Sequence, residues 1–153
     1  MAIDLAIGFR DPTQPVSVVG SITRSLNVNI RGVCMYEVEG NRTLHLLLEE
    51  EANLTQALTT QGLAEYTLTD VVVLDLQDRP GVFEAVMSAI DGADIRLKFA
   101  YTSGVWLVLG ATDPARLRAE LGRAFKLDDP DEFGAGVIKR MDPSVVPLIE
   151  STE

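Results

Sequence analysis

One order of hydrophobic and polar positions occurs twice along the chain. Ile3–Phe9 alternates apolar residues with small or polar ones, which is typical of a strand with one buried face, and Val71–Leu76 begins in the same way. After each strand, apolar residues recur at spacings of three and four, which indicates an amphipathic helix. These residues are Val19, Ile22 and Leu26 in the first half and Phe83, Val86 and Ile90, each 64 positions later, in the second. The shared offset predicts an internal repeat.

A hairpin, a second helix and a last strand complete each half of the pattern. Glu39–Asn41 and Thr102–Gly104 contain the glycine and asparagine residues that accept a positive φ, which predicts two tight turns. We expect the last strands at Tyr66–Thr69 and Val137–Met141. The second helices carry Leu54 and Leu58 in one half and Leu117 and Leu121, 63 positions later, in the other.

Each half therefore has the order β-α-β-β-α-β. This order is typical of a ferredoxin-like α+β fold, in which an antiparallel four-stranded sheet carries both helices on one face. The prediction is one unit over residues 1–69 and a second over residues 70–141. Residues 142–153 contain two prolines and no periodicity, so we expect a C-terminal tail there.

Composition and charge narrow the classes of partner. The 153 residues include 13 Lys and Arg against 23 Asp and Glu, a net charge of −10, and such a surface repels nucleic-acid phosphates and anionic lipid headgroups. The longest apolar run is far shorter than the roughly 20 residues that a membrane span needs. We therefore expect neither nucleic acid nor a membrane as a partner. The single cysteine, Cys34, excludes an intrachain disulfide and favours a reducing compartment, the cytoplasm.

Few side chains have the chemistry of a catalytic or metal site. The only histidine, His45, has no second histidine or nucleophile motif at a fixed spacing, so we expect a structural or surface role for it. Cys34 lies among apolar residues and is interpreted as a small core side chain. The sequence contains no phosphate-binding loop and no metal-binding pattern. We therefore predict no catalytic residues, no cofactor and no metal site.

The second half resembles a known family. Leu74–Val82 is followed by an amphipathic helix, then by Ala93–Ile95 and a hairpin, and this series resembles an ACT domain, in which Asp/Asn-x-Pro-Gly separates the first strand from the first helix. Residues 3–110 as a whole resemble the small stand-alone tandem ACT proteins. The first half departs from the family pattern, because its loop Asp11–Pro15 has no glycine. The resemblance implies a regulatory module that holds an amino acid near the strand-to-helix loops, where two domains meet.

The residues of the second loop are consistent with such a site. Pro80 sets the φ angle needed where a helix starts, and Gly81 lets the backbone approach a ligand closely. The free amides at the helix start then favour a carboxylate, and Asp78 or Asp94 is a suitable acceptor for an ammonium group. The alternative interpretation is that Asp78 only caps the helix and Arg79 lies in solvent.

We accordingly predict a ligand site at the junction between the two units. One side of it is the loop and the other is the start of the second strand of the first unit. The predicted ligand-binding residues are Asp78, Arg79, Pro80, Gly81, Val82, Asn27, Asn29, Ile30 and Asp94.

Three functions remain open at this stage. The first is a non-catalytic regulatory protein that binds an amino acid and acts through ligand-dependent association. The second is a regulatory subunit of an amino-acid biosynthetic enzyme, with the catalytic chain as its protein partner. The third is a small enzyme, since the ferredoxin-like fold hosts unrelated activities. We also expect a homodimer, because Val33, Met35, Val71 and Val73 are predicted to give the helix-free faces an apolar surface.

Overall fold

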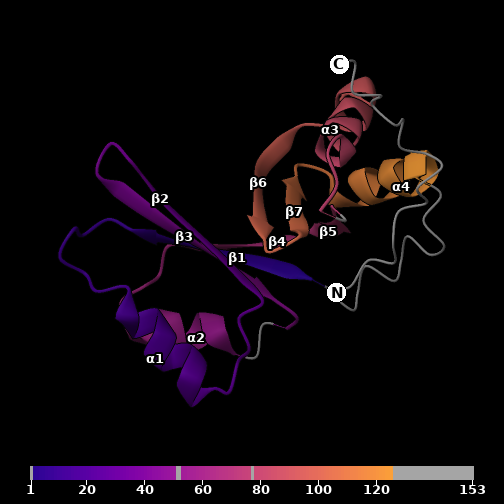
Figure 1. The fold of residues 1–153 in the computed structure, drawn as a ribbon. Coiled ribbons are helices and arrows are strands. Elements are labelled where there is room, and N and C mark those ends of the chain that lie inside the picture. Colours follow the sequence, from indigo (N-terminus) through magenta and orange to yellow (C-terminus); the bar gives the residue numbers. More distant parts are fainter. Residues whose placement is uncertain (1, 51–52, 77, 126–153) are drawn as a thin grey trace. The chain divides into compact units, whose positions relative to one another are not determined.

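The repeat in the sequence corresponds to two structural units. The computed structural model describes residues 2–50, 53–76 and 78–125, and the chain divides into Met1–Asp70 and Val71–Glu153. Each unit has its own antiparallel sheet and its own pair of helices (Figure 1). The predicted α+β class, with ferredoxin-like units, is confirmed.

The first unit is built on a four-stranded antiparallel sheet. Its strands are β1 (Ile3–Phe9), β2 (Gly32–Val38), β3 (Asn41–Leu48) and β4 (Tyr66–Asp70), in the spatial order β2-β3-β1-β4. The two central strands are β1 and β3, so each of them has a neighbouring strand on both sides.

Helices α1 (Ser17–Ser25) and α2 (Leu54–Thr60) cover one face of this sheet (Figure 1). Their apolar residues form a single core with alternate residues of β1 and β3, among them Leu5 and Leu46. The intervening residues of the strands point to the opposite side, which we call the helix-free face. It carries Asp4, Ala6, Gly8, Cys34, Tyr36, Thr43, His45, Leu47, Thr67 and Thr69.

The second unit repeats this arrangement over the part of it that the structure describes. Its strands β5 (Val72–Asp75), β6 (Leu97–Ser103) and β7 (Trp106–Ala111) have the order β5-β7-β6. Its helices are α3 (Val82–Gly92) and α4 (Pro114–Phe125). Asp113 caps α4, because its Oδ1 accepts the Arg116 amide at 3.0 Å. The expected last strand, 137–141, and the expected tail, 142–153, lie outside the described residues.

Three of the helices end in the same backbone conformation. Asn27, Gly62 and Asp94 follow α1, α2 and α3 with φ angles of 55°, 80° and 51°. The next amide donates to a carbonyl five residues back in each case, at 2.8 Å from Val28, 2.9 Å from Leu63 and 3.1 Å from Ile95. These bonds satisfy carbonyls that a helix end otherwise leaves unpaired. The repeat therefore extends from the hydrophobic pattern to the way the helices stop.

Two boundaries differ from the sequence prediction. In α3 the buried residues are Val82, Val86 and Ile90, whereas Phe83 is 53% exposed. The buried face of α3 therefore begins at Val82, one residue before the Phe83 that the sequence spacing predicts. Strand β2 starts at Gly32, so Asn29 and Ile30 belong to the connection before it.

The apolar surface expected on the helix-free face is also placed differently. The register pairs Val33 with Leu46 and Met35 with Leu44, so both residues point to the face that the helices cover. They are nevertheless 57% and 53% exposed, and β2 is an edge strand of the sheet. Val71 and Val73 are buried. Val33 and Met35 are therefore exposed on the edge strand β2 and not on the helix-free face.

Candidate ligand-binding site

The loop between β5 and α3 turns sharply at two residues. Asp78 has a φ of 46° and Gly81 a φ of 87°, both in the left-handed region. Glycine reaches this region without cost, and aspartate is one of the few other residues that tolerate it. The Leu76 amide donates to the Val105 carbonyl at 2.9 Å and the Arg79 amide to the Leu76 carbonyl at 3.2 Å, so the loop is tied to the β6–β7 hairpin.

This loop leads into the N-terminus of α3. The residue at the cap position makes no side-chain hydrogen bond to the helix. Gly81 occupies that position and has no side chain to accept from the first amides of the helix. The first turn of an α-helix has amides without intrahelical partners and carries the positive end of the helix dipole. An anion is therefore favoured at this point. The residue at the cap position is thus Gly81 and not Asp78.

Arg79 supplies a second feature that favours an anion. Its Nη2 atom is buried and has no hydrogen-bond partner among the residues that the structure describes. A buried donor without a partner costs about 1–3 kcal/mol, more for a charged group. A guanidinium matches a carboxylate with two parallel hydrogen bonds. Arg79 and the start of α3 thus supply two anion-favouring groups within four residues of chain, 79–82.

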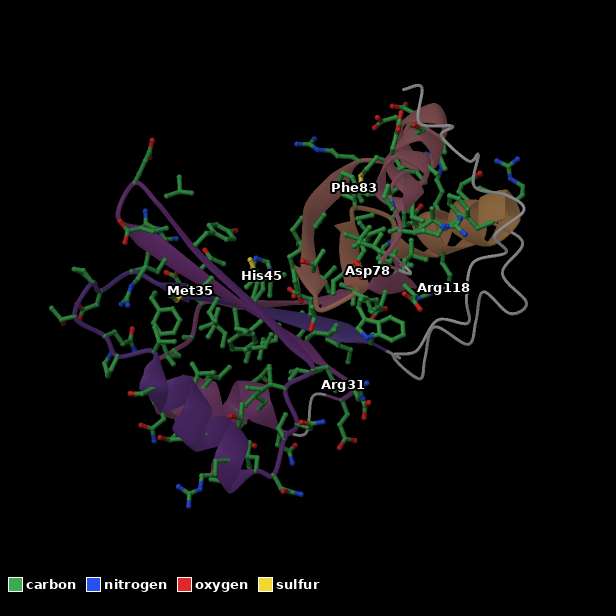
Figure 2. The ribbon with its side chains drawn as sticks, viewed as in Figure 1. Arg31, Met35, His45, Asp78, Phe83 and Arg118 are labelled. Carbon is green, nitrogen blue, oxygen red and sulfur yellow. The ribbon has the colours of Figure 1, made fainter. Side chains whose placement is uncertain are left out.

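The structure brings the loop residues together but places Asp94 elsewhere in the second unit. Asp94 follows the C-terminal end of α3, whereas Gly81 caps its N-terminus. The eleven residues of α3 make a helix about 16 Å long. Asp94 thus lies a helix length from the loop, where its left-handed backbone ends α3 (Figure 2 labels Asp78 at the other end).

The residues predicted for the other side of the site lie in the first unit. Asn27 ends α1 in the left-handed conformation, and Asn29 and Ile30 follow it as exposed residues of the α1–β2 connection. Their role toward a ligand, and a site shared between the units, stay predictions.

Sequence analysis did not predict the contacts that His45 makes with Asp4 and Tyr36. Its Nδ1 lies 2.8 Å from Asp4 Oδ2, with the two side chains 5% and 0% exposed. The ring of Tyr36 stacks on the imidazole at a centroid distance of 5.7 Å, and its Oη lies 3.5 Å from Nε2. The alternation in β1 and β3 places Asp4 and His45 on one face, but only the strand register shows that they meet. The expected structural role of His45 agrees with this burial.

Other classes of site find little support in the described part of the chain. Within residues 2–50, 53–76 and 78–125, no three His, Cys, Asp or Glu side chains cluster as metal ligands do. Over the same ranges, none of the helices combines the length and the apolar character needed to cross a bilayer.

Comparison with known proteins identifies the fold of the chain but no family. No family model matches the sequence, and no curated protein matches it significantly. Solved structures do match. The protein BT0572 from Bacteroides thetaiotaomicron superimposes with a TM-score of 0.67 at 15% identity, over 79% of this chain and 86% of that one. The regulatory subunit of aspartate kinase from Thermus flavus gives 0.54 at 17% identity, over 78% and 90%.

The ligand-free regulatory subunit of aspartate kinase from Thermus thermophilus gives a TM-score of 0.57 at 15% identity, again over 78% of this chain and 90% of that one. At such low identities the likeness concerns the fold alone. It agrees with the resemblance to small ACT-domain proteins seen in the second half of the sequence. The chain has the fold of the regulatory subunits of aspartate kinase.

Proposed function

We propose that the chain is a non-catalytic regulatory protein that binds an amino acid at the loop Asp78–Val82. The observation that carries this proposal is the buried Nη2 of Arg79, which has no partner among the described residues. It stands next to a helix N-terminus whose cap position is glycine. Both features attract a carboxylate, and their coincidence on one short loop supports a built anion site.

An amino acid fits this loop better than a simple anion does. Asp78 lies in the same turn and is exposed, so its carboxylate is available to accept an ammonium group. A zwitterion that binds a few amides, one guanidinium and one carboxylate is expected in the micromolar to millimolar range, about −4 to −8 kcal/mol. The fold shared with regulatory subunits of aspartate kinase supports a role linked to amino-acid biosynthesis.

The same comparisons favour one further candidate, a regulatory subunit bound to a separate catalytic chain. Two of the matched structures are described as regulatory subunits, and they share most of their length with this chain. Copurification of a larger chain from the native host, in stoichiometric amount, distinguishes this candidate from a free-standing regulator. We place both in the cytoplasm, on the basis of the single cysteine.

Association into a homodimer is part of this proposal. Strand β2 is an edge of the described sheet, and Val33, Met35 and Val38 leave it strongly apolar. Exposed edge strands pair readily with another strand, so we place the dimer contact at β2 of two copies, related by a twofold axis.

A thermal-shift screen against the twenty amino acids tests the binding proposal. A ligand present at about 100 times its dissociation constant stabilises the folded state by about 2.7 kcal/mol. For domains of this size we expect a rise in melting temperature of about 5 °C or more. The proposal is wrong if none of the twenty raises the melting temperature.

A further inference from the structure

Two large apolar side chains are exposed in the described part of the second unit, and both belong to segments that flank the loop Asp78–Val82. Phe83 is 53% exposed and follows this loop directly, in the first turn of α3 (Figure 2). Val105 is 42% exposed and precedes β7, and its carbonyl accepts the Leu76 amide at 2.9 Å, just before the loop. Ligand sites combine apolar side chains with a few polar groups, so this pair is a candidate contact for the side chain of a ligand.

The direction of helical side chains places the Phe83 ring on the side of the loop. In an α-helix the Cα–Cβ bonds tilt toward the N-terminus, so a side chain covers the turn before its own Cα. Phe83 is the second residue of α3, and the chain before it is the loop that ends at Gly81 and Val82. A ligand whose carboxylate is held by the first amides of α3 therefore has the Phe83 ring beside it.

The corresponding loop of the first unit is covered by a side chain from its own sheet. Arg42 pairs with Phe9 at the end of β1, and its guanidinium carbon lies 5.3 Å from the centre of the Phe9 ring. Its Nη2 donates to carbonyls of the β1–α1 loop, at 2.8 Å to Gln14 and 3.2 Å to Asp11. Val105, beside the loop of the second unit, is short and has no side-chain donor. It cannot cover its loop in this way, and it leaves an apolar surface exposed there.

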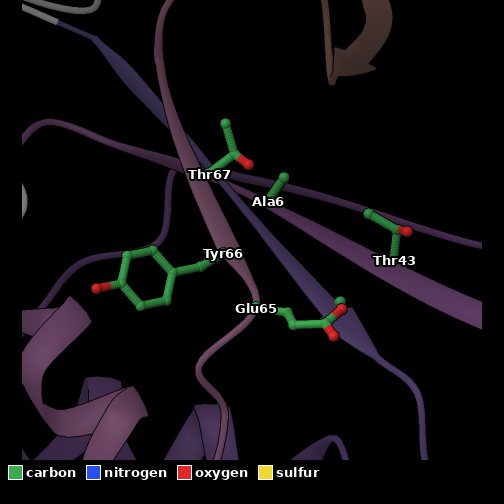
Figure 3. A pocket seen from close by; sticks show the side chains of 6 residues that line it. Ala6, Thr43, Glu65, Tyr66 and Thr67 are labelled. Atoms are coloured by element: carbon green, nitrogen blue, oxygen red, sulfur yellow. The ribbon is translucent and has the colours of Figure 1, made fainter.

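A hollow in the first unit lacks this combination of features. It encloses about 270 Å³ on the helix-free face and is lined by Glu65 and by uncharged residues of β1, β3 and β4 (Figure 3). The carboxylate of Glu65 is paired with Arg10 at 2.6 Å, and its side chain is 54% exposed. The loop Asp78–Val82 therefore has the stronger claim to a ligand.

We propose that the ligand of the loop Asp78–Val82 is an amino acid with an apolar side chain, which lies against Phe83 and Val105. This inference rests on the proposed function and adds the class of ligand to it. Contact with the ligand removes apolar surface of both residues from water, and the gain grows with the apolar area of the ligand's own side chain. Glu84, exposed beside Phe83, repels a second carboxylate and so disfavours aspartate and glutamate. Phe83 and Val105 thus determine specificity, whereas Arg79 and the helix amides bind the carboxylate that all amino acids share.

The test compares L-leucine with L-alanine by calorimetric titration of the full chain. The two probes share the ammonium and the carboxylate and differ only in the size of the apolar side chain. We expect leucine to bind about tenfold more tightly than alanine or better, because its additional carbon atoms lie against Phe83 and Val105. L-Lysine and L-glutamate carry charged side chains and are expected to bind no more tightly than alanine. Tighter binding of lysine or glutamate than of leucine would overturn the proposal.

Variants test the two residues directly. Phe83→Ala and Val105→Ala are each expected to lower the affinity for leucine by about fivefold and to leave the affinity for alanine within about twofold of the wild type. Both residues are exposed, so neither substitution should affect folding. Tyr66→Ala removes an aromatic side chain that is 36% exposed on β4 of the first unit. It is the matched control and should leave both affinities unchanged.

The outcomes separate this proposal from the proposed function. If none of the four amino acids binds, both are wrong. If leucine and alanine bind equally, or if Phe83→Ala and Val105→Ala keep the wild-type ratio of the two affinities, the loop binds amino acids but the role given to Phe83 and Val105 is wrong. A ratio that falls toward one in both variants, and not in Tyr66→Ala, supports the proposal.

Discussion

The ring of Phe99 lies over the backbone of Gly110 on the neighbouring strand. The two residues are paired in the register of β6 and β7, directly after an irregularity at Leu97–Phe99. A Cβ atom on Gly110 would stand 2.2 Å from Cζ of the phenyl ring, a distance that no real contact allows. Phe99 also stacks on Tyr101, with ring centroids 6.1 Å apart. Only glycine leaves room for this aromatic pair on the sheet.

The first prediction follows from that contact. Gly110→Ala should lower the free energy of unfolding by about 1–3 kcal/mol, because the ring must leave its place. Urea denaturation measures this loss. Combining it with Phe99→Leu should recover part of the stability, with a coupling energy of about 1 kcal/mol or more.

A second glycine provides the matched control. Gly20 lies inside α1, and a Cβ atom there would meet nothing within 4 Å. Gly20→Ala should therefore stabilise the chain by about 0.5–1 kcal/mol through helix propensity. Equal effects of the two substitutions would contradict the role given to Phe99.

The buried pair of Asp4 and His45 yields the second prediction. Asp4→Leu and His45→Leu each remove one partner of a contact that is almost wholly buried. We expect each to cost about 2 kcal/mol or more, because the remaining polar group loses a buried hydrogen bond. The comparison is Arg10→Gln, which breaks an ion pair whose side chains are 70% and 54% exposed. That change should cost less than about 1 kcal/mol.

The third prediction concerns pH. The Thr13 hydroxyl and amide donate to Asp11 Oδ1 at 2.7 and 2.8 Å and hold the pKa of that carboxyl below its ordinary value. A carboxyl whose pKa is lower in the folded state stabilises the fold above its unfolded pKa, about 3.9. This contribution disappears as the pH falls through the folded pKa. Thr13→Val should return the pKa of Asp11 toward its ordinary value in a carboxyl NMR titration, and an unchanged pKa would assign the effect to another group.

The fourth prediction tests the proposed dimer contact. Met35→Lys places a charge on the exposed edge strand β2 and should convert the dimer to a monomer in sedimentation velocity at micromolar concentration. Leu68→Lys is the matched control, because Leu68 is a partly exposed apolar residue on the other edge strand, β4. If only Leu68→Lys dissociates the dimer, the contact lies at β4 and not at β2. A monomeric wild type would contradict the proposed dimer.

Much of the fold could be predicted because local and global signals agree. The alternation in Ile3–Phe9 and the spacing of Val19 and Ile22 are set by burial in one core, and burial leaves a periodic trace in the sequence. The turn at Glu39–Asn41 lies where the sequence predicts it, and Gly40 has the expected positive φ of 80°, but the second positive φ is at Glu39 and not at Asn41, which already belongs to β3.

The remaining features depend on strand register, which a single sequence does not encode visibly. Val33 and Met35 alternate as a half-buried strand should, but their face is decided by pairing with Leu46 and Leu44. Asp4 and His45 are 41 residues apart, and only the pairing of β1 with β3 joins them.

The most direct test of the proposed regulatory function is a calorimetric titration of the full chain with the amino acid that gives the largest thermal shift. The variants are Arg79→Gln, which removes the guanidinium with the unpartnered Nη2, and Arg123→Gln, which removes an exposed guanidinium from α4. For the wild type and for Arg123→Gln we predict one binding site per chain, at the loop Asp78–Val82. For Arg79→Gln we predict a loss of affinity of about tenfold or more, since a charge-assisted contact contributes about 1.5–3 kcal/mol. Equal affinity of the Arg79→Gln and Arg123→Gln variants would contradict the account.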